Sequence, residues 1–203
     1  MKKLRLPLVL VAAALVSFLQ APKEISKKER KDAIAHFKAT RLFLQKEIRG
    51  LSEAQLNWKP ADSVWSIANC VEHIAVTEKG IYDWAIATLQ APVDSKLDLT
   101  KKPADEDILT KVADRSTKAK APEVFRPSGR FGTTAAAYNA FDKKRDSLIQ
   151  YMKTTKDDLR GHYSTTFFGP TDVYQILLLL STHTKRHTLQ IVELKAMPGF
   201  PSR

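Results

Sequence analysis

Two histidines have the spacing that most directly suggests chemistry in this sequence. His183 and His187 lie four residues apart, so in a helix both imidazoles project from one side, about one turn apart. This is the spacing with which a helix offers two nitrogen ligands to one metal ion. Residues around them recur in steps of three and four and form one stripe: Val173, Ile176, Leu180, His183, His187, Gln190 and Leu194. Two imidazoles and one amide therefore take places at which leucine would pack.

The energetic cost of these polar side chains indicates that they have partners. Burying a polar group without a hydrogen bond costs about 1–3 kcal/mol, and a typical protein is stable by only about 5–15 kcal/mol. The pair lies on the apolar stripe and not on the face that holds Lys185, Arg186 and Glu193. Histidines four apart are also common on exposed helix faces, so spacing alone leaves both a metal site and an ordinary helix face open.

A third histidine lies on another predicted helix. His73 is close to Cys70 and Ile74, which belong to the apolar stripe of that helix. Crossing or antiparallel helices could bring His73 against the pair. Three imidazoles would leave a metal ion one or more open positions, as in catalytic rather than structural sites. The other two histidines, His36 and His162, are interpreted as surface or capping residues.

Four long helices with apolar residues at helical spacing are predicted to position these side chains. They span about 24–49, 66–89, 134–153 and 172–196. Gly50 is placed to end the first helix, Ser66 to cap the second and Asp172 to begin a capping box on the fourth. The segment 91–132 contains four prolines and one shorter helical stretch, 105–118, and predicts a crossover. No run shows sustained strand alternation, so we predict an all-α fold, an antiparallel four-helix bundle with one long crossover connection.

The composition is that of a soluble globular protein. The 203 residues are 43% hydrophobic and 27% charged, which suits one domain with a packed core. The single cysteine, Cys70, excludes an intramolecular disulfide and a cysteine-rich zinc site. Only seven glycines are present, which argues against an all-β fold built on many tight turns.

The amino terminus has the pattern of a secretory signal. Residues 1–5 include three basic side chains, and 6–19 are almost wholly apolar. This run is shorter than the roughly 20 residues that span a membrane. Pro22 is awkward for a signal peptidase, so an uncleaved amino-terminal anchor is the alternative. We predict a signal peptide or anchor over 1–21, a bundle domain over 22–203, and export to the periplasm or the medium.

The charge pattern bears on partners. The formal net charge is +11, and removing residues 1–21, which hold three basic and no acidic side chains, leaves +8. The signs are interspersed, as in Lys27-Lys28-Glu29-Arg30-Lys31, which is typical of a solvated helix face. No basic patch alternates with aromatic residues, so we expect no nucleic-acid partner. We expect a small-molecule substrate of unknown identity. Membrane contact is expected only through an uncleaved amino terminus, and the sequence leaves open whether the protein forms a homodimer.

Several segments together resemble a known family. They are Leu51 to Pro60, Trp65-Ser66-Ile67 with His73 on the same helix, and Thr182-His183-Thr184-Lys185-Arg186-His187-Thr188-Leu189-Gln190-Ile191 followed by Pro198-Gly199-Phe200-Pro201. With these residues the sequence resembles the DinB/YfiT-like superfamily of metalloenzymes over most of the chain after the signal segment. The resemblance implies a four-helix bundle with a divalent metal ion held by three histidines, which match His73, His183 and His187.

The resemblance implies less about the reaction. Members similar to this chain include transferases that use low-molecular-weight thiols and proteins named only as hydrolases, and an export signal departs from the thiol-using, cytoplasmic members. A metal ion with three histidine ligands can lower the pKa of bound water to about 7 or present a thiolate. Zinc, nickel, iron and cobalt all suit such ligands. We predict an exported metal-dependent enzyme of hydrolase or transferase type; the alternative is a non-catalytic metal- or ligand-binding bundle.

No residue is assigned a catalytic role from the sequence. Glu72 is next to His73 but points about 100° around the helix from it, and Glu78 is more than a turn away from His73. Neither is therefore named as a base. Gln190 shares the histidine stripe and is predicted to contact a ligand or the substrate. Cys70 is interpreted as a packed thiol. Arg145, on the inner side of its helix, is expected to extend to solvent, with pairing to an acid or a substrate anion as the alternative.

Overall fold

The computed structural model describes residues 24–117 and 120–202, and the predicted signal or anchor over 1–21 lies outside them. In chain order the elements are α1 (Lys27–Ile48), α2 (Glu53–Asn57), α3 (Ile67–Gln90), η1 (Leu99–Lys101), α4 (Asp105–Lys111), η2 (Glu123–Phe125), α5 (Thr134–Thr154), β1 (Tyr163–Thr166), β2 (Gly169–Asp172) and α6 (Val173–Lys195). The four long helices lie close to their predicted positions. Within the described ranges, no helix is long and apolar enough to cross a membrane.

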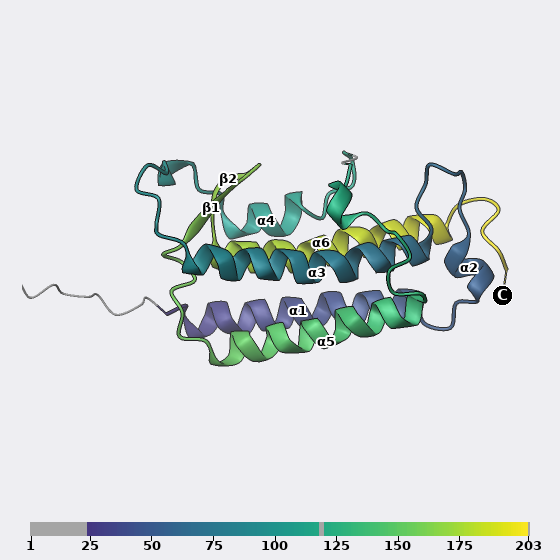
Figure 1. The fold of residues 1–203 in the computed structure, drawn as a ribbon, viewed down its shortest axis with the longest axis horizontal. Coiled ribbons are helices and arrows are strands. Elements are labelled where there is room, and N and C mark those ends of the chain that lie inside the picture. The colour runs from purple at the N-terminus through teal and green to yellow at the C-terminus, as the bar shows by residue number, and fades with distance from the viewer. Residues whose placement is uncertain (1–23, 118–119, 203) are drawn as a thin grey trace, which may run out of the picture.

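The long helices α1, α3, α5 and α6 form the predicted four-helix bundle with one long crossover (Figure 1). Each helix packs on two others: α3 on α5 and α6, and α1 on the same two. The helices α1 and α6 run in one direction, and α3 and α5 run in the other. The neighbours α3 and α6 are therefore antiparallel, as are α1 and α5, whereas α3 and α5 are parallel. A parallel pair needs a connection that returns along the bundle, which is why the crossover is long.

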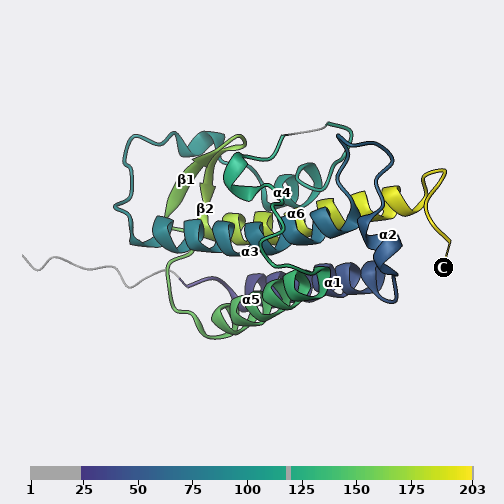
Figure 2. The ribbon, with the colours of Figure 1, turned by 45° about the vertical axis from the view of Figure 1, so that its right-hand side comes forward.

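The crossover, residues 91–133, carries η1, α4 and η2 back along the α3–α6 side of the bundle (Figure 2). Its helix ends at Lys111, earlier than the predicted end at residue 118. Two interactions account for this. The carboxylate of Asp114 accepts the backbone N–H of Ser116 and closes a turn, and Arg186 of α6 donates to the carbonyls of Asp114 and Thr117. Side-chain partners thus replace the hydrogen bonds that would continue the helix.

The predicted caps of α3 and α6 and the predicted stop after α1 are confirmed. Ser66 caps α3, and Asp172 forms a reciprocal capping box with Gln175 at the start of α6. Gly50 has φ 73°, the left-handed conformation expected just after a helix. Inside the predicted connection after α1, the structure adds the short helix α2, whose capping residue is Ser52.

The structure adds one pair of short strands to the predicted helical fold. β1 and β2 form an antiparallel hairpin that pairs Tyr163 with Asp172 and Thr166 with Gly169. Each strand has four residues, too few for an alternating pattern to be visible in the sequence. The hairpin joins α5 to α6, and its last residue is also the cap of α6.

The core consists of two apolar clusters, one at each end of the bundle. The first includes Phe37 and Leu148, and the second includes Leu44 and Phe141. Arg145 lies between them and has no exposed side-chain surface. The expectation that Arg145 extends to solvent is therefore wrong, and the alternative of pairing with an acid is correct.

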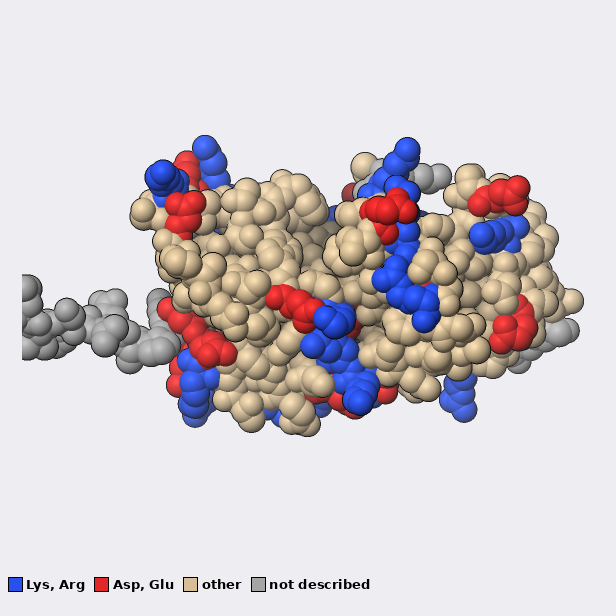
Figure 3. Space-filling view, viewed as in Figure 1, with Lys and Arg blue, Asp and Glu red and all other residues tan. Residues whose placement is uncertain are grey.

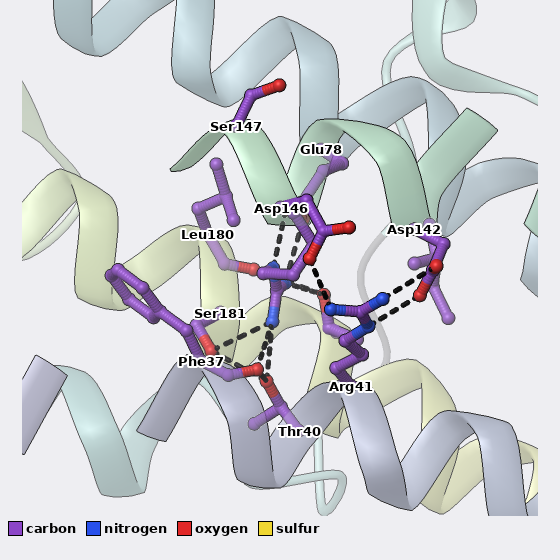
Figure 4. A network of polar contacts seen from close by, with 12 residues as sticks. Phe37, Thr40, Arg41, Glu78, Asp142, Asp146, Ser147, Leu180 and Ser181 are labelled. Atoms are coloured by element: carbon purple, nitrogen blue, oxygen red, sulfur yellow. Dashed lines mark hydrogen bonds and ion pairs between the residues drawn. The ribbon is translucent and has the colours of Figure 1, made fainter. Parts of the chain in front are cut away.

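The partners of Arg145 come from all the other long helices, and Figure 4 labels Glu78 of α3, Thr40 of α1 and Ser181 of α6 among them. Its guanidinium donates to both carboxylate oxygens of Glu78, at 2.6 and 2.8 Å. It also donates to Phe37 O, Thr40 Oγ1, Ser181 Oγ and Thr184 Oγ1. Because Glu78 shields the charge and each of these acceptors lies within 3.5 Å, the arginine forms a buried polar layer instead of reaching water.

The surface carries charges of both signs. On the face shown in Figure 3, basic and acidic groups lie next to each other. Charged side chains form ion pairs at many places on the protein, such as Lys28 with Asp32 and Arg41 with Asp142. This matches the alternation of signs in the sequence.

Candidate metal centre

The structure brings together the three histidines that the sequence singled out. His73 lies on α3, and His183 and His187 lie on the antiparallel α6. The Nε2 atom of His183 is 3.3 Å from Nε2 of His73 and 3.2 Å from Nε2 of His187. One nitrogen from each ring lies within 4.8 Å of the other two. We call this group the histidine cluster. Among the described residues, no aspartate, glutamate or cysteine belongs to it.

Each ring in the cluster has a hydrogen-bond partner at its other nitrogen. Nδ1 of His73 lies 2.7 Å from the carbonyl oxygen of Phe125, in η2 of the crossover. Nδ1 of His187 lies 2.9 Å from Oε1 of Gln190. Nδ1 of His183 lies 3.3 Å from the hydroxyl of Thr77, one turn after His73 on α3. Gln190, which was predicted to contact a ligand or the substrate, contacts the candidate ligand His187.

These partners determine which ring nitrogen carries the proton. The carbonyl of Phe125 can only accept, so Nδ1 of His73 must donate. The hydroxyl of Thr77 gives its proton to the carbonyl of His73, at 2.7 Å, and is left to accept from His183. Oε1 of Gln190 also accepts from Arg115, at 3.4 Å, which is consistent with an oxygen facing His187. In this arrangement each proton is on Nδ1, and each Nε2 turns a lone pair toward the others.

The surroundings keep the rings uncharged. Burial, and then the neighbouring imidazole of His73, lower the pKa of His187 to about 3. Burial is also the main reason that the pKa of His183 lies well below its ordinary value and that of His73 is lowered. The ring of Trp65 packs against His73, with centroids 4.9 Å apart, and adds to this burial. Three neutral imidazoles are therefore ready to act as ligands near neutral pH.

The donor set fits a divalent transition-metal ion. Three Nε2 lone pairs face one another with no proton between them, which is unfavourable unless a cation lies among them. Nitrogen ligands at about 2.0–2.1 Å from a tetrahedral zinc ion are about 3.3 Å from one another. Two of the three Nε2 separations, at 3.2 and 3.3 Å, agree with this value, and one nitrogen of each ring lies within 4.8 Å of the other two. A partner at each Nδ1 is also typical of metal-binding histidines.

Other candidate residues do not take part in the cluster. Glu72 accepts three backbone N–H groups of the crossover, and Glu78 pairs with Arg145. Cys70 is fully buried in the second apolar cluster, and burial raises the pKa of its thiol to about 12, so it is the packed, inert residue that we predicted. Glu72, Glu78 and Cys70 thus have structural roles, and the decision not to name either carboxylate as a base agrees with the structure.

The two remaining histidines lie elsewhere. His36 is on α1, with Nε2 3.2 Å from the hydroxyl of Thr182, so it is part-buried between helices and is not a plain surface residue. The backbone carbonyl of His162 accepts the N–H of Val173 where the hairpin meets α6. The sequence did not identify Thr77 or Phe125 as partners of the cluster. Thr77 lies on the apolar stripe of α3, and its place there is a signal that could have found it.

A four-helix bundle with a long crossover and a histidine cluster between α3 and α6 defines the class of protein, and comparison with known proteins identifies the family. Residues 36–191 match the DinB superfamily, so the chain belongs to that family. The family resemblance seen in the sequence is confirmed.

The individual relatives share about a quarter or less of their aligned residues with this chain. The uncharacterized protein YuaE of Bacillus subtilis (strain 168) is 27% identical over 161 residues, which cover 78% of this chain and 94% of YuaE. A protein of Geobacillus kaustophilus with the provisional name metal-dependent hydrolase is 24% identical, covering 91% of this chain and 94% of its own. The structure of YfiT from Bacillus subtilis, described as a probable metal-dependent hydrolase with an unusual four-helix bundle topology, has a TM-score of 0.50 and 16% identity. That match covers 85% of this chain and 89% of YfiT, and it shows a shared fold.

Proposed function

We propose that this protein is a metal-dependent hydrolase whose divalent ion is held by His73, His183 and His187. The observation that carries the proposal is the convergence of three Nε2 atoms whose partner nitrogens all have hydrogen-bond acceptors. Relatives that carry the provisional name metal-dependent hydrolase support the same reaction class. Zinc, nickel, iron and cobalt remain the candidate ions.

The residues of the site have separable tasks in this proposal. A divalent ion with three histidine ligands and an open position supplies a Lewis acid and an activated water. The three imidazoles bind it without bringing negative charge, so the ion keeps its full charge toward a substrate. The acceptors at Thr77, Gln190 and the Phe125 carbonyl hold the imidazoles in orientation. The indole of Trp65 covers one side of the cluster and limits access of water.

One observation favours a second function, a non-catalytic metal- or ligand-binding protein. Hydrolases commonly place a carboxylate or another base beside the ion. The two carboxylates nearest to His73 in sequence, Glu72 and Glu78, are each occupied by several hydrogen bonds. In the part of the chain that the structure describes, no carboxylate joins the cluster.

Removing the metal distinguishes these functions. We expect the purified protein to contain about one divalent ion per chain by elemental analysis, and to lose hydrolysis of an ester and amide panel when a chelator strips the ion. Adding back zinc, nickel, iron or cobalt should restore the rate. A rate that is indifferent to the chelator would contradict the hydrolase. Metal binding without turnover on any substrate would favour the binding protein.

The hydroxyl of Thr77 provides a sharper test of the cluster. Thr77→Val keeps the shape of the side chain but leaves Nδ1 of His183 without its acceptor, so we expect the affinity for Zn²⁺ to fall by about 10-fold. Thr88→Val is a matched control, because Thr88 is also buried on α3 and donates to the carbonyl four residues before it, Trp84 O. Zn²⁺ affinity is measured by competition with a chromophoric chelator. An equal affinity in both variants would exclude an orienting role for Thr77.

We further propose that the protein is exported, on the basis of the basic and apolar pattern of residues 1–21. The described helices begin at Lys27, so removal of residues 1–21 would leave every element of the bundle intact. Fractionation of cells tests this: mature protein in the periplasm or medium supports a cleaved signal, full-length protein in the membrane fraction supports an anchor, and cytoplasmic protein contradicts export.

A further inference from the structure

Glu72 is next to the candidate ligand His73 on α3, yet its carboxylate binds the crossover. It accepts the backbone N–H groups of Ser128, at 2.9 Å, Gly129, at 3.0 Å, and Arg130, at 3.1 Å. Burial alone would raise the pKa of the Glu72 carboxyl, but these three hydrogen bonds outweigh it and the pKa lies below its ordinary value. An ionised, nearly buried carboxylate with three backbone donors is a strong local attachment.

The same stretch of crossover supplies the acceptor for His73. The carbonyl of Phe125 lies 2.7 Å from Nδ1 of that ring, only three residues before the first N–H that Glu72 binds. The ring of Phe125 packs against Gly80, which lies about two turns after His73 on α3. A methyl group added to Gly80 would lie 2.9 Å from Cζ of Phe125 and closer still to Cε1, so glycine is needed for this approach. We call residues 123–132 the crossover loop.

This loop depends on contacts with α3 for its position. Its only regular structure is the three-residue η2, which is too short to be stable alone. Glu72 holds one side of the loop, and the contact between Phe125 and Gly80 holds the other. The carbonyl of Phe125 lies between these attachments. Consecutive residues on a helix point about 100° apart, so Glu72 can hold the loop while His73 receives the carbonyl that the loop carries.

We infer that Glu72 and Gly80 are positioning residues, which fix the crossover loop so that the carbonyl of Phe125 orients His73 as a metal ligand. This inference rests on the proposed metal site. It assigns Glu72 a role through His73 and no role in proton transfer. Outer partners of metal-binding histidines commonly change metal affinity by about 10–100-fold, which is the scale of effect expected here.

The first test replaces the carboxylate. In Glu72→Gln, an amide NH₂ replaces one of the two carboxylate oxygens and leaves at least one of the three backbone N–H groups without its acceptor. We therefore expect the amides of 128–130 to exchange with solvent at least about 10-fold faster and Zn²⁺ affinity to fall by about 10-fold or more. Asp107→Asn is the matched control, because Asp107 also lies in the crossover and accepts a backbone N–H, that of Ala104, but does not contact the loop. Affinity is measured with Zn²⁺ at a temperature at which every variant is folded.

The second test uses a substitution that should stabilise the helix but weaken metal binding, so that an effect on positioning can be told from an effect on stability. Alanine is favoured over glycine inside a helix, so Gly80→Ala acting through the helix alone would raise the denaturation midpoint of the metal-free protein and leave Zn²⁺ affinity unchanged. If the loop positions His73, the added methyl displaces Phe125 and affinity falls by about 10-fold. In a Phe125→Ala background there is no ring to displace, so the further change Gly80→Ala should cost no affinity.

A spectroscopic measurement completes the test in the metal-free protein. Nitrogen-15 NMR of the imidazoles should show His73 protonated at Nδ1 in the native chain and in Asp107→Asn, and a mixture of tautomers in Glu72→Gln. Native protein that fails to bind Zn²⁺ would contradict the proposed function, while the tautomer and amide exchange would still decide this inference. Unchanged affinity, tautomer and exchange in both Glu72→Gln and Gly80→Ala would overturn it.

Discussion

Replacing His183 with alanine is expected to abolish stoichiometric metal binding. Nε2 of His183 lies close to both other Nε2 atoms, at 3.3 Å from His73 and 3.2 Å from His187. Without it, two imidazoles remain, from different helices, with a space between them that water can enter. Because a ligand is lost and not merely reoriented, the effect should exceed the roughly 10–100-fold typical of outer partners. Elemental analysis of the purified variant and competition for Zn²⁺ measure it.

His36→Ala is the matched control for this experiment. The imidazole of His36 also lies between helices, 3.2 Å from the hydroxyl of Thr182, and burial lowers its pKa to about 4. It is therefore a neutral, part-buried histidine that contacts α6 but lies outside the cluster. We expect this variant to keep its metal. Equal metal content in His183→Ala and the native protein would rule out the three-histidine site and, with it, the proposed hydrolase.

The features that the sequence predicted well depend on residues close together in the chain. Ser66 and Asp172 cap helices through residues three positions away, and Gly50 ends a helix through its own backbone conformation. The pair His183 and His187 belongs to the same class, since their relation is set by helical geometry alone. Adding His73 required a second helix, but the apolar stripes of the two helices indicated which faces would meet.

The features that the sequence could not predict join residues far apart in the chain. Arg145 and Glu78 are 67 positions apart, and nothing in either helix shows that their side chains meet at one level of the bundle. The acceptor of His73 is a backbone carbonyl, and every residue has one, so no residue type indicates Phe125. The same holds for the three N–H groups that Glu72 binds. Backbone N–H groups are common to almost all residues, so the residue types do not indicate which of them a carboxylate will bind.

The buried pair of Arg145 and Glu78 leads to the second large effect. Arg145→Met leaves the carboxylate of Glu78 buried and unpaired, and we expect the free energy of unfolding to fall by about 3–5 kcal/mol, as for other buried pairs that lose one partner. Arg41→Met is the matched control. Arg41 also joins α1 and α5, bonding to Asp142 at 2.5 and 2.7 Å and to Asp146, but it is partly exposed (Figure 4). Its loss should cost less than about 1 kcal/mol.

Removing both charges separates the cost of an unpaired ion from the value of the pair. In Arg145→Met with Glu78→Leu neither charge of this buried pair remains, and the hydroxyl of Thr40 keeps its bonds to Ser181, at 2.7 Å, and to Phe37 O, at 3.2 Å. We therefore expect the double variant to recover most of the stability that Arg145→Met loses. Chemical denaturation of the metal-free proteins measures all three, because bound metal would add its own stabilisation. A double variant as unstable as the single one would show that the layer contributes through the hydrogen bonds of Arg145 to the other three long helices and not through charge pairing.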